Sequence, residues 1–404
     1  MELNKKILLT ALAQIKAYKD IIVFRDSLTE GCVDILYAPR IDEPKAFFKM
    51  TVRIAGTGAD LFDDSPVVEK LGSPVPVFLS RIRAALKDAE TCVFENGCVN
   101  GIRVTIDKDV PENVRSGIIV EAYEHHLKEI KKEKNVAAVT FRKNEWEYAI
   151  AECTKFVSTD TSRFYMNGIC FDFLVGVDNC VNLAATDGRK LILIKHAFQN
   201  ANKKNEGDKF TIPPAYLFTP ASDYNSVHLQ LTDKYGLLSI ATEDYRFEGV
   251  FECIDGEFPN YPRVIPEIDG NSQWVALCAA SFQMTIDSVK SLMGKDTAIY
   301  LDARNPESLN ITVVNGTTTL EVEGMSSRPM LLSFNWEHLA PCFFGGMALT
   351  KFMLNGSGQA ILSRSTKPVR GLSMDVTKIF MPTKGEDSDY RGCDEFRIPK
   401  AKEA

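Results

Sequence analysis

The sequence predicts an α+β fold made of three tandem copies of one unit, each with two helices packed on antiparallel sheets. Six amphipathic segments recur along the chain, and each carries one apolar stripe at helical spacing. Alternating apolar and polar runs lie between them and turn at Asn-Gly or Asp-Gly pairs, which favour hairpins. The length of 404 residues also suits about three ordinary domains.

Each predicted helix is defined by its apolar stripe. In the first, Leu8, Leu12 and Ile15 share one face. In the fourth, Pro213 and Pro214 occupy the first turn, where a missing N–H is tolerated. The predicted helices are Leu3–Tyr18, Val75–Ala89, Asn144–Val157, a short one beginning near Ile212, Ser281–Met293 and Phe334–Phe344.

The strands are predicted from alternation and turn residues. Asp187-Gly188, Asn315-Gly316 and Asn355-Gly356 mark tight turns between two runs. The predicted strand regions are Val181–Leu193, Val227–Val250, Leu309–Val322 and Lys351–Ser363.

Domain boundaries follow from composition. Lys128–Asn135 is a charged stretch that ends the first unit, and Phe258–Asn271, rich in Pro and Gly, ends the second. Gly385–Ala404 is polar and without periodicity, which is typical of a tail. We therefore predict domains at 1–135, 136–266 and 267–384, followed by a tail at 385–404.

The composition restricts the class of protein. The net charge of -7 argues against a simple, tight nucleic-acid binder, which is usually basic. The ten cysteines form no C-x-x-C pair and lie in apolar runs, as reduced core thiols of a cytosolic protein do. Neither a signal peptide nor an apolar run of about 20 residues is present, so a soluble cytoplasmic protein is expected.

Motifs for catalysis or cofactor binding are not found. Gly56-x-Gly58 and Gly356-x-Gly358 lack the third glycine of a dinucleotide loop, and no phosphate-binding P-loop occurs. His125 and His126 have no His or Cys at metal-ligand spacing, which favours a surface helix. We predict no catalytic residue, no metal and no cofactor.

Three motifs carry a family resemblance over about residues 136–384. The first motif consists of two stretches, Arg163-Phe-Tyr-Met-Asn-Gly168 and Ala185-Thr-Asp-Gly-Arg-Lys-Leu191. The second is Ile254-Asp-Gly-Glu-Phe-Pro-Asn-Tyr-Pro-Arg-Val-Ile-Pro266, and the third, near the end, is Ile379-Phe-Met-Pro-Thr-Lys384. In this order they resemble the bacterial DNA polymerase III beta subunit, the beta sliding clamp. The first 135 residues share only the helix-and-hairpin pattern.

The resemblance implies a fold, an assembly and partners. Three DNA-clamp domains per chain would dimerise head to tail into a ring that encircles duplex DNA without sequence preference. DNA polymerase and clamp-loader subunits would bind through short peptide motifs. A chain of this kind is a processivity factor rather than an enzyme, and it works in the cytoplasm at the nucleoid.

The resemblance also implies an apolar cleft for partner peptides. The Asp187-Gly188 turn would bring Thr186 and Leu191 onto one strand face, and Pro262 and Pro266 would keep the second motif extended. Methionines in such a groove adapt to several partners. The predicted cleft residues are Arg163, Tyr165, Met166, Thr186, Gly188, Arg189, Lys190, Leu191, Pro259, Arg263, Val264, Ile379, Phe380, Met381 and Pro382.

Some of these residues depart from the family pattern. Arg189 stands where a neutral or imidazole side chain is common, and Lys190 replaces an arginine, so a point charge replaces a bidentate fork. Phe380 and Thr383 also differ from the usual residues. Taken singly, Met166 or Ile379 would be an ordinary core residue, and only the grouping by motif indicates a site.

DNA-facing residues follow from the same resemblance, which places helices around the hole of the ring. A clamp must not grip phosphates tightly, because each neutralised phosphate adds affinity and slows sliding, so an acidic protein with a modestly basic lining is consistent with the role. The predicted DNA-facing residues are Lys5, Lys16, Lys19, Arg81, Arg83, Lys87, Lys155, Lys290 and Lys295.

Two alternatives stay open at this point. An interaction module could keep the cleft without encircling DNA, because ring closure would need the first domain, where the motifs are missing. An enzyme would need a strongly perturbed carboxylate in a deep pocket. A separate hypothesis concerns the tail, whose Phe396 and Ile398 could fold back over the chain's own groove.

Overall fold

The computed structural model describes most of the chain, with gaps. The described residues are 2–3, 5–15, 17, 21–27, 32–39, 45–53, 74–87, 92–95, 98–100, 102–105, 116–133, 136–174, 180–197, 207–220, 223–243, 245–270, 272–292, 298–313, 318–344, 349–354, 360–365, 372 and 375–382. The predicted tail and the turns at Asn315-Gly316 and Asn355-Gly356 lie outside them.

By contacts, the chain divides into two compact units. The first contains residues 1–147, 173–179 and 197–255, and the second contains 148–172, 180–196 and 256–404. Helices and antiparallel sheets occur in both, so the predicted α+β class is confirmed. The division into three domains ending at residues 135, 266 and 384 stays a prediction.

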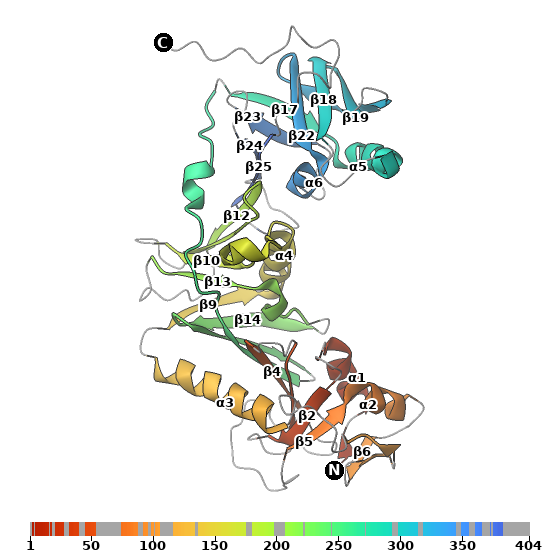
Figure 1. Ribbon diagram of the computed structural model, residues 1–404, viewed down its shortest axis with the longest axis vertical. Coiled ribbons are helices and arrows are strands. Elements are labelled where there is room, and N and C mark those ends of the chain that lie inside the picture. Colours follow the sequence, from red (N-terminus) through yellow and green to blue (C-terminus); the bar gives the residue numbers. More distant parts are fainter. Residues whose placement is uncertain are drawn as a thin grey trace. The chain divides into compact units, whose positions relative to one another are not determined.

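A large antiparallel sheet organises the first unit (Figure 1), with strand order β5–β2–β3–β4–β16–β15–β14–β9. Its centre is the pairing of β4 with β16, which sets Phe47 opposite Val250. Strands from the predicted first and second domains therefore share one sheet. The strands are β2 (Ile21–Asp26), β3 (Cys32–Tyr37), β4 (Ala46–Arg53), β5 (Val75–Phe78), β9 (Ala137–Arg142), β14 (Tyr224–Leu231), β15 (Tyr235–Thr242) and β16 (Tyr245–Glu252).

Two short helices pack together in this unit, α1 (Lys5–Gln14) and α2 (Leu79–Leu86). The predicted stripe of α1 is buried at Leu8, Leu12 and Ile15. The start of the second predicted helix was wrong, because residues 75–78 form β5 and pair with β2. A small sheet of β1 (Glu2–Leu3), β6 (Cys92–Glu95), β7 (Cys98–Val99) and β8 (Ile102–Arg103) lies in the same unit.

A 17-residue helix, α3 (Ser116–Lys132), covers one face of the large sheet. Its Ile119, Tyr123 and Ile130 are buried in one cluster with Val23 of β2 and other sheet residues. The alternate β2 residue Phe24 is also buried, so both faces of the sheet are covered. The sequence prediction missed most of this helix, since the lysines of its last turn were interpreted as a boundary.

Polar contacts also attach α3 to the sheet. Tyr123 Oη donates to Glu248 Oε2 at 3.3 Å, and Lys49 Nζ lies 2.5 Å from the same carboxylate oxygen. Arg25 Nη1 lies 2.8 Å from Glu124 Oε1. Burial alone would raise the pKa of Glu248, but Lys49 and Arg246 lower it below its ordinary value. The helix is therefore held by both apolar and charged contacts.

The side chain of His126, on α3, is buried rather than exposed as predicted. Its ring lies against Phe47 and Tyr235, with centroids 5.3 and 4.8 Å away, and Nδ1 contacts Ala122 O at 2.8 Å. Glu252 Oε1 is 3.8 Å from Nε2, and Lys234 and His125 add positive charge nearby. Burial lowers the pKa of His126 below its ordinary value, despite the raising effect of Ala122 O and Glu252.

This environment predicts a loss of stability in acid. Below about pH 6.5 the unfolded chain binds a proton at His126 that the folded chain resists, so stability falls as the pH drops. We expect the midpoint temperature of thermal unfolding to decrease as the pH is lowered from about 7.5 to 5.5. The decrease should be smaller in His126→Phe, which keeps the ring contacts. Burial also lowers the pKa of His228 and His338, so part of the fall remains. An unchanged pH dependence in the variant would contradict this role.

The second unit contains two sheets. In the larger one, strands of this unit follow the order β10–β11–β12–β25–β24–β23–β17–β21, and the smaller one has the order β20–β19–β18–β22. Three predicted strand regions pair as expected, β11 leading into β12, β19 with β20 and β23 with β24. The strands are β10 (Ile169–Phe173), β11 (Cys180–Thr186), β12 (Lys190–Ala197), β17 (Gln273–Leu277), β18 (Ala298–Asn305), β19 (Ser308–Val313), β20 (Thr318–Val322), β21 (Gly324–Ser326), β22 (Met330–Asn335), β23 (Thr350–Leu354), β24 (Ile361–Ser365) and β25 (Asp375–Phe380).

The remaining helices agree with prediction in place more than in length. α4 (Lys143–Thr154) and α5 (Ala279–Val289) fit well, whereas the sixth predicted helix shrinks to α6 (Trp336–Leu339) and a 3-10 turn. The fourth is only the 3-10 turn Pro214–Tyr216, which follows β13 (Lys209–Ile212). Two further 3-10 turns, η3 (Thr161–Met166) and η6 (Tyr261–Val264), contribute to the site described next.

Candidate functional site

An apolar cavity of about 130 Å³ opens on the second unit, where the three sequence motifs meet. Its walls come from η3, the turn between β11 and β12, the segment around η6 and the end of β25. The lining residues are Met166, Thr186, Gly188, Arg189, Lys190, Leu191, Pro259, Asn260, Tyr261, Val264, Ile379 and Met381.

The turn between β11 and β12 is fixed by its own side chains. Asp187 Oδ1 accepts from the backbone N–H groups of Arg189 and Lys190 at 2.8 and 2.9 Å. Thr186 Oγ1 donates to Lys190 O at 2.7 Å and accepts from Gly188 N at 3.0 Å. An Asp and a Thr at these positions thus make a rigid turn at the cavity wall.

Gly188 is required at this turn. Its φ is +86°, in the region that favours glycine, and a Cβ there would meet Arg163 Nη1 at 2.9 Å and Met166 Cε at 3.9 Å. Arg163 itself is held by Asp160, whose Oδ2 accepts from Arg163 Nε at 2.9 Å. Hydrogen bonds from Ser162 and Arg163 lower the pKa of Asp160 to about 2. The motif Arg163–Gly168 therefore packs against the Asp187-Gly188 turn.

The segment from Phe258 to Val264 is anchored by two aromatic rings. Phe258 and Tyr261 are buried in one cluster with Leu191 and Ile379. Tyr261 Oη donates to Asp172 Oδ2 at 2.7 Å and accepts from Asn182 Nδ2 at 3.2 Å. Burial and the Asp172 bond raise the pKa of Tyr261 above its ordinary value. The anchored Tyr261 leaves Val264 half exposed, at 52%, on the cavity wall.

Strand β25 supplies the opposite wall. It pairs with β12, which sets Leu191 beside Ile379, and Met381 N donates to Arg189 O at 2.8 Å. Ile379 and Met381 line the cavity, as residues two apart on a strand should. Phe380 between them is buried elsewhere, with its ring 5.8 Å from Phe334 and 5.9 Å from Phe352. Phe380 is therefore a core residue, contrary to the prediction.

Ten of the fifteen predicted cleft residues line this cavity, and five do not. Besides Phe380, these are Arg163 behind the turn, Tyr165 beside Gly256, the exposed Arg263 and the half-buried Pro382. Asn260 and Tyr261 line it but were not predicted. A large aromatic residue within a Pro-rich stretch was the signal that could have identified Tyr261 as an anchor. Peptide binding by these cavity residues stays a prediction.

Two 3-10 turns occur in the cleft motifs, and one of them contradicts an expectation. The motif that begins at Arg163 overlaps the 3-10 turn η3, which is capped by Asp160. The segment through Pro262 was expected to be extended but contains the 3-10 turn η6, with Pro262 in its first turn. Proline is compatible with the start of such a turn, because the N–H that it lacks is not needed there.

Positive charge gathers around the cavity. Lys190 Nζ lies 3.8 Å from Asp187 Oδ2 and 5.8 Å from the centre of the Phe156 ring, so its side chain is largely buried. Arg189 also lines the cavity, and Arg263 is exposed on η6. No carboxylate is among the lining residues within the described part of the chain. The site therefore suits an apolar ligand that also carries negative charge.

The DNA-facing candidates have different surroundings. Lys87 is exposed, and Arg81 lies over the Phe78 ring at 4.7 Å. Arg83 Nη2 donates to Leu12 O at 2.5 Å, so it caps the end of α1 rather than projecting freely. Lys5 lies on α1, Lys155 pairs with Glu152, and Lys290 lies over the Trp336 ring. Lys16, Lys19 and Lys295 lie outside the described residues.

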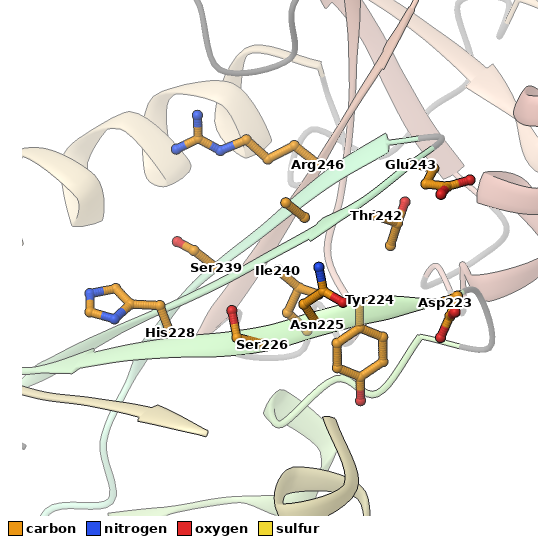
Figure 2. Close-up of a pocket in the computed structure, with 11 residues that line it drawn as sticks. Asp223, Tyr224, Asn225, Ser226, His228, Ser239, Ile240, Thr242, Glu243 and Arg246 are labelled. Atoms are coloured by element: carbon orange, nitrogen blue, oxygen red, sulfur yellow. The ribbon is translucent and has the colours of Figure 1, made fainter. Parts of the chain in front are cut away.

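A second, more open cavity of about 590 Å³ lies in the first unit around the β14–β15 hairpin (Figure 2). Asp223 Oδ1 is 2.6 Å from Lys143 Nζ, which lowers the pKa of Asp223. The ring nitrogens of His228 contact Thr140 Oγ1 and Gln230 Nε2, each at 3.1 Å. Each of these groups has a structural partner, and the raised carboxylate pKa that an enzyme would need does not occur at Asp223.

Other kinds of site find little support in the described part of the chain. Its His, Cys, Asp and Glu residues form no group of three or more that could hold a metal ion. None of its nine cysteines is in a disulfide. No described helix is both long and apolar enough to span a membrane.

Comparisons with known proteins give a consistent family. No protein-family model matches the chain. It is 27% identical to the beta sliding clamp of Caulobacter vibrioides over 197 residues (46% of this chain, 50% of that protein) and 29% identical to that of Treponema pallidum over 119 residues (28% of each). The aligned stretches thus span half or less of these relatives.

The fold comparison extends further than the sequence. The DnaN sliding clamp of Bartonella birtlesii, solved with griselimycin bound, superposes with a TM-score of 0.70 and 15% identity, over 95% of this chain and 99% of that one. Residues 1–135, which carry no family motif, are thus largely included in the shared fold. The chain is therefore a beta sliding clamp-like protein, with the fold of these clamps and detectable similarity to them in sequence.

Proposed function

We propose that this chain is a DNA sliding clamp, in which two copies close head to tail into a ring around duplex DNA. Each copy tethers DNA polymerase or a clamp-loader subunit through its apolar cleft, and the chain itself catalyses no reaction. The main support for this proposal is the fold similarity, which covers 99% of the DnaN clamp of Bartonella birtlesii. In this role the protein is cytoplasmic and associated with the nucleoid.

The cavity supports the tethering part of the proposal. Its 130 Å³ is close to the ~150 Å³ of an engineered cavity that holds benzene, so it accepts one or two partner side chains. Burial of two or three such side chains, at about 1.5–3 kcal/mol each and less the ordering cost, gives roughly micromolar affinity. Partners would therefore exchange. Griselimycin, which a similar clamp binds, is our proposed probe ligand.

The edges of the two small sheets support the assembly. β8 in the first unit and β20 in the second are end strands of their sheets, and Ile102 of β8 is 53% exposed. An exposed edge can pair with a strand of a second chain, and a head-to-tail contact that closes makes a ring. The net charge of -7 is consistent with a ring that slides rather than grips.

Topology provides the test of encirclement. We expect protein that a clamp loader with ATP has placed on nicked circular plasmid to stay there during gel filtration in high salt, and to be lost once a restriction enzyme linearises the plasmid. A ring leaves by sliding over an end, whereas a phosphate-binding protein does not depend on ends. Binding that is equal on circular and linear DNA would contradict the proposal.

A second candidate is a clamp-fold interaction module that binds partner peptides without encircling DNA. It is favoured by one observation, that the sequence match covers only 46% of the chain. Light scattering over a dilution series separates the two. A stable dimer, at twice the 45.0 kDa chain, supports the ring, and a monomer at every concentration supports the module.

A further inference from the structure

Basic residues are unevenly distributed over the helices α1, α2, α4 and α5. α1, α2 and the cap of α2 carry five, namely Lys5, Lys6, Arg81, Arg83 and Lys87, and no acidic residue. By contrast, α4 carries three carboxylates and one lysine, and α5 with its cap carries one aspartate and one lysine. Because α1 and α2 pack together (Figure 1), we call these five basic residues the α1–α2 patch.

Three charges of the α1–α2 patch are exposed to a ligand. Lys6 and Lys87 are exposed. Arg81 is exposed too, but its guanidinium is steadied by the Phe78 ring and by a 3.3 Å hydrogen bond from Nη1 to Thr105 O. Arg83 contributes less, because it caps α1. An anion would therefore meet three exposed cations without a carboxylate on either helix.

The basic residues on or just after α4 and α5 already have contacts. Lys155 Nζ lies 2.5 Å from Glu152 Oε1, and Lys143 Nζ lies 2.6 Å from Asp223 Oδ1. Lys290, just after α5, lies 5.4 Å from the centre of the Trp336 ring, and Asp287 is exposed one turn earlier. A phosphate that approached these helices would compete with a carboxylate or be repelled by one.

We propose that the α1–α2 patch is the main phosphate-binding surface of this chain for duplex DNA, and that α4 and α5 contribute little. The inference rests on the proposed function and refines it, because the sequence had assigned DNA-facing residues to all these helices. DNA is the chosen partner because its phosphates match a carboxylate-free row of lysine and arginine. The ring would then hold DNA by one patch per chain.

Two double variants with equal charge change test the proposal. Lys6→Gln with Lys87→Gln removes two cations from the α1–α2 patch, and Lys155→Gln with Lys290→Gln removes two elsewhere. Binding of each full-length protein to a labelled linear duplex is measured by fluorescence anisotropy from about 50 to 200 mM salt. We expect the first pair to lower the slope of log affinity against log salt by about 2, near 1 per lysine, and the second to leave it nearly unchanged.

The outcomes separate this inference from the proposed function. Equal slopes in the two double variants, or a larger change in the second, overturn the inference and leave the clamp intact. Absence of wild-type binding to the duplex, together with absence from the nicked circle, overturns the clamp and the inference with it. Circular dichroism of each variant verifies folding, which exposed lysines should not disturb.

Discussion

Glu152→Ala is expected to destabilise the second unit by about 3–5 kcal/mol, because it leaves a buried lysine without its counter-ion. Lys378 on β25 is 1% exposed, and its Nζ donates to Glu152 Oε2 at 2.7 Å. It also donates to Phe343 O at 2.8 Å and Pro341 O at 3.0 Å, and it lies 4.7 Å from the centre of the Phe344 ring. Burial lowers the pKa of Lys378.

The reverse deletion should cost less. In Lys378→Met, Glu152 keeps Lys155 as a partner at 2.5 Å, and its 13% exposed side chain reaches some water. Burial alone would raise the pKa of Glu152, but Lys378 and Lys155 lower it below its ordinary value. The double variant Glu152→Gln with Lys378→Met should recover most of the loss, because it replaces both charges with neutral side chains and leaves no buried charge unpaired.

Urea unfolding gives the free energy, and hydrogen exchange of the β25 amides gives a local readout in a chain with more than one unit. Asp375→Ala is the matched control on the same strand. It breaks an ion pair with Arg364 whose side chains are 47% and 29% exposed, so a loss below about 1 kcal/mol is expected. Equal losses for Glu152→Ala and Asp375→Ala would mean that the buried pair has no special weight.

The sequence was informative where structure is local. The β11–β12 hairpin was predicted from Asp187-Gly188, and the stripes of α1, α4 and α5 were read from helical spacing. The alternation of side chains along a strand could also have excluded Phe380 from the predicted cleft. If Ile379 and Met381 face a groove, Phe380 between them must face the other way, as it does.

Long-range pairing could not be predicted in this way. The β4–β16 pairing joins residues about 200 positions apart, and the residue pattern of neither strand identifies its partner. α3 was missed because its buried stripe includes Tyr123 and His126, which look polar, and because its last turn is rich in lysine. The cavity was identified from motifs rather than from periodicity, since its walls come from four separate segments.

Val264→Asp is expected to weaken griselimycin binding about 30- to 100-fold while the fold is retained. Val264 lines the cavity but is 52% exposed, so a carboxylate there stays hydrated in the unliganded protein. A bound apolar side chain would exclude that water, and the partly buried carboxylate adds its own penalty to the lost contact, together about 2–3 kcal/mol. Val264→Ala, which loses two methyl groups, should cost about tenfold.

Calorimetric titration of griselimycin measures the affinity, and Met284→Asp is the control. Met284 is 73% exposed on α5 and does not line the cavity, so its change to aspartate should leave the affinity unchanged. Val264→Asp should keep the wild-type mass in light scattering and the wild-type circular dichroism, because the cleft and the contact between chains are different surfaces. If it lost griselimycin binding and the wild-type mass together, the substitution would have disturbed the fold. Wild-type affinity in Val264→Asp would instead mean that the ligand binds outside the cavity.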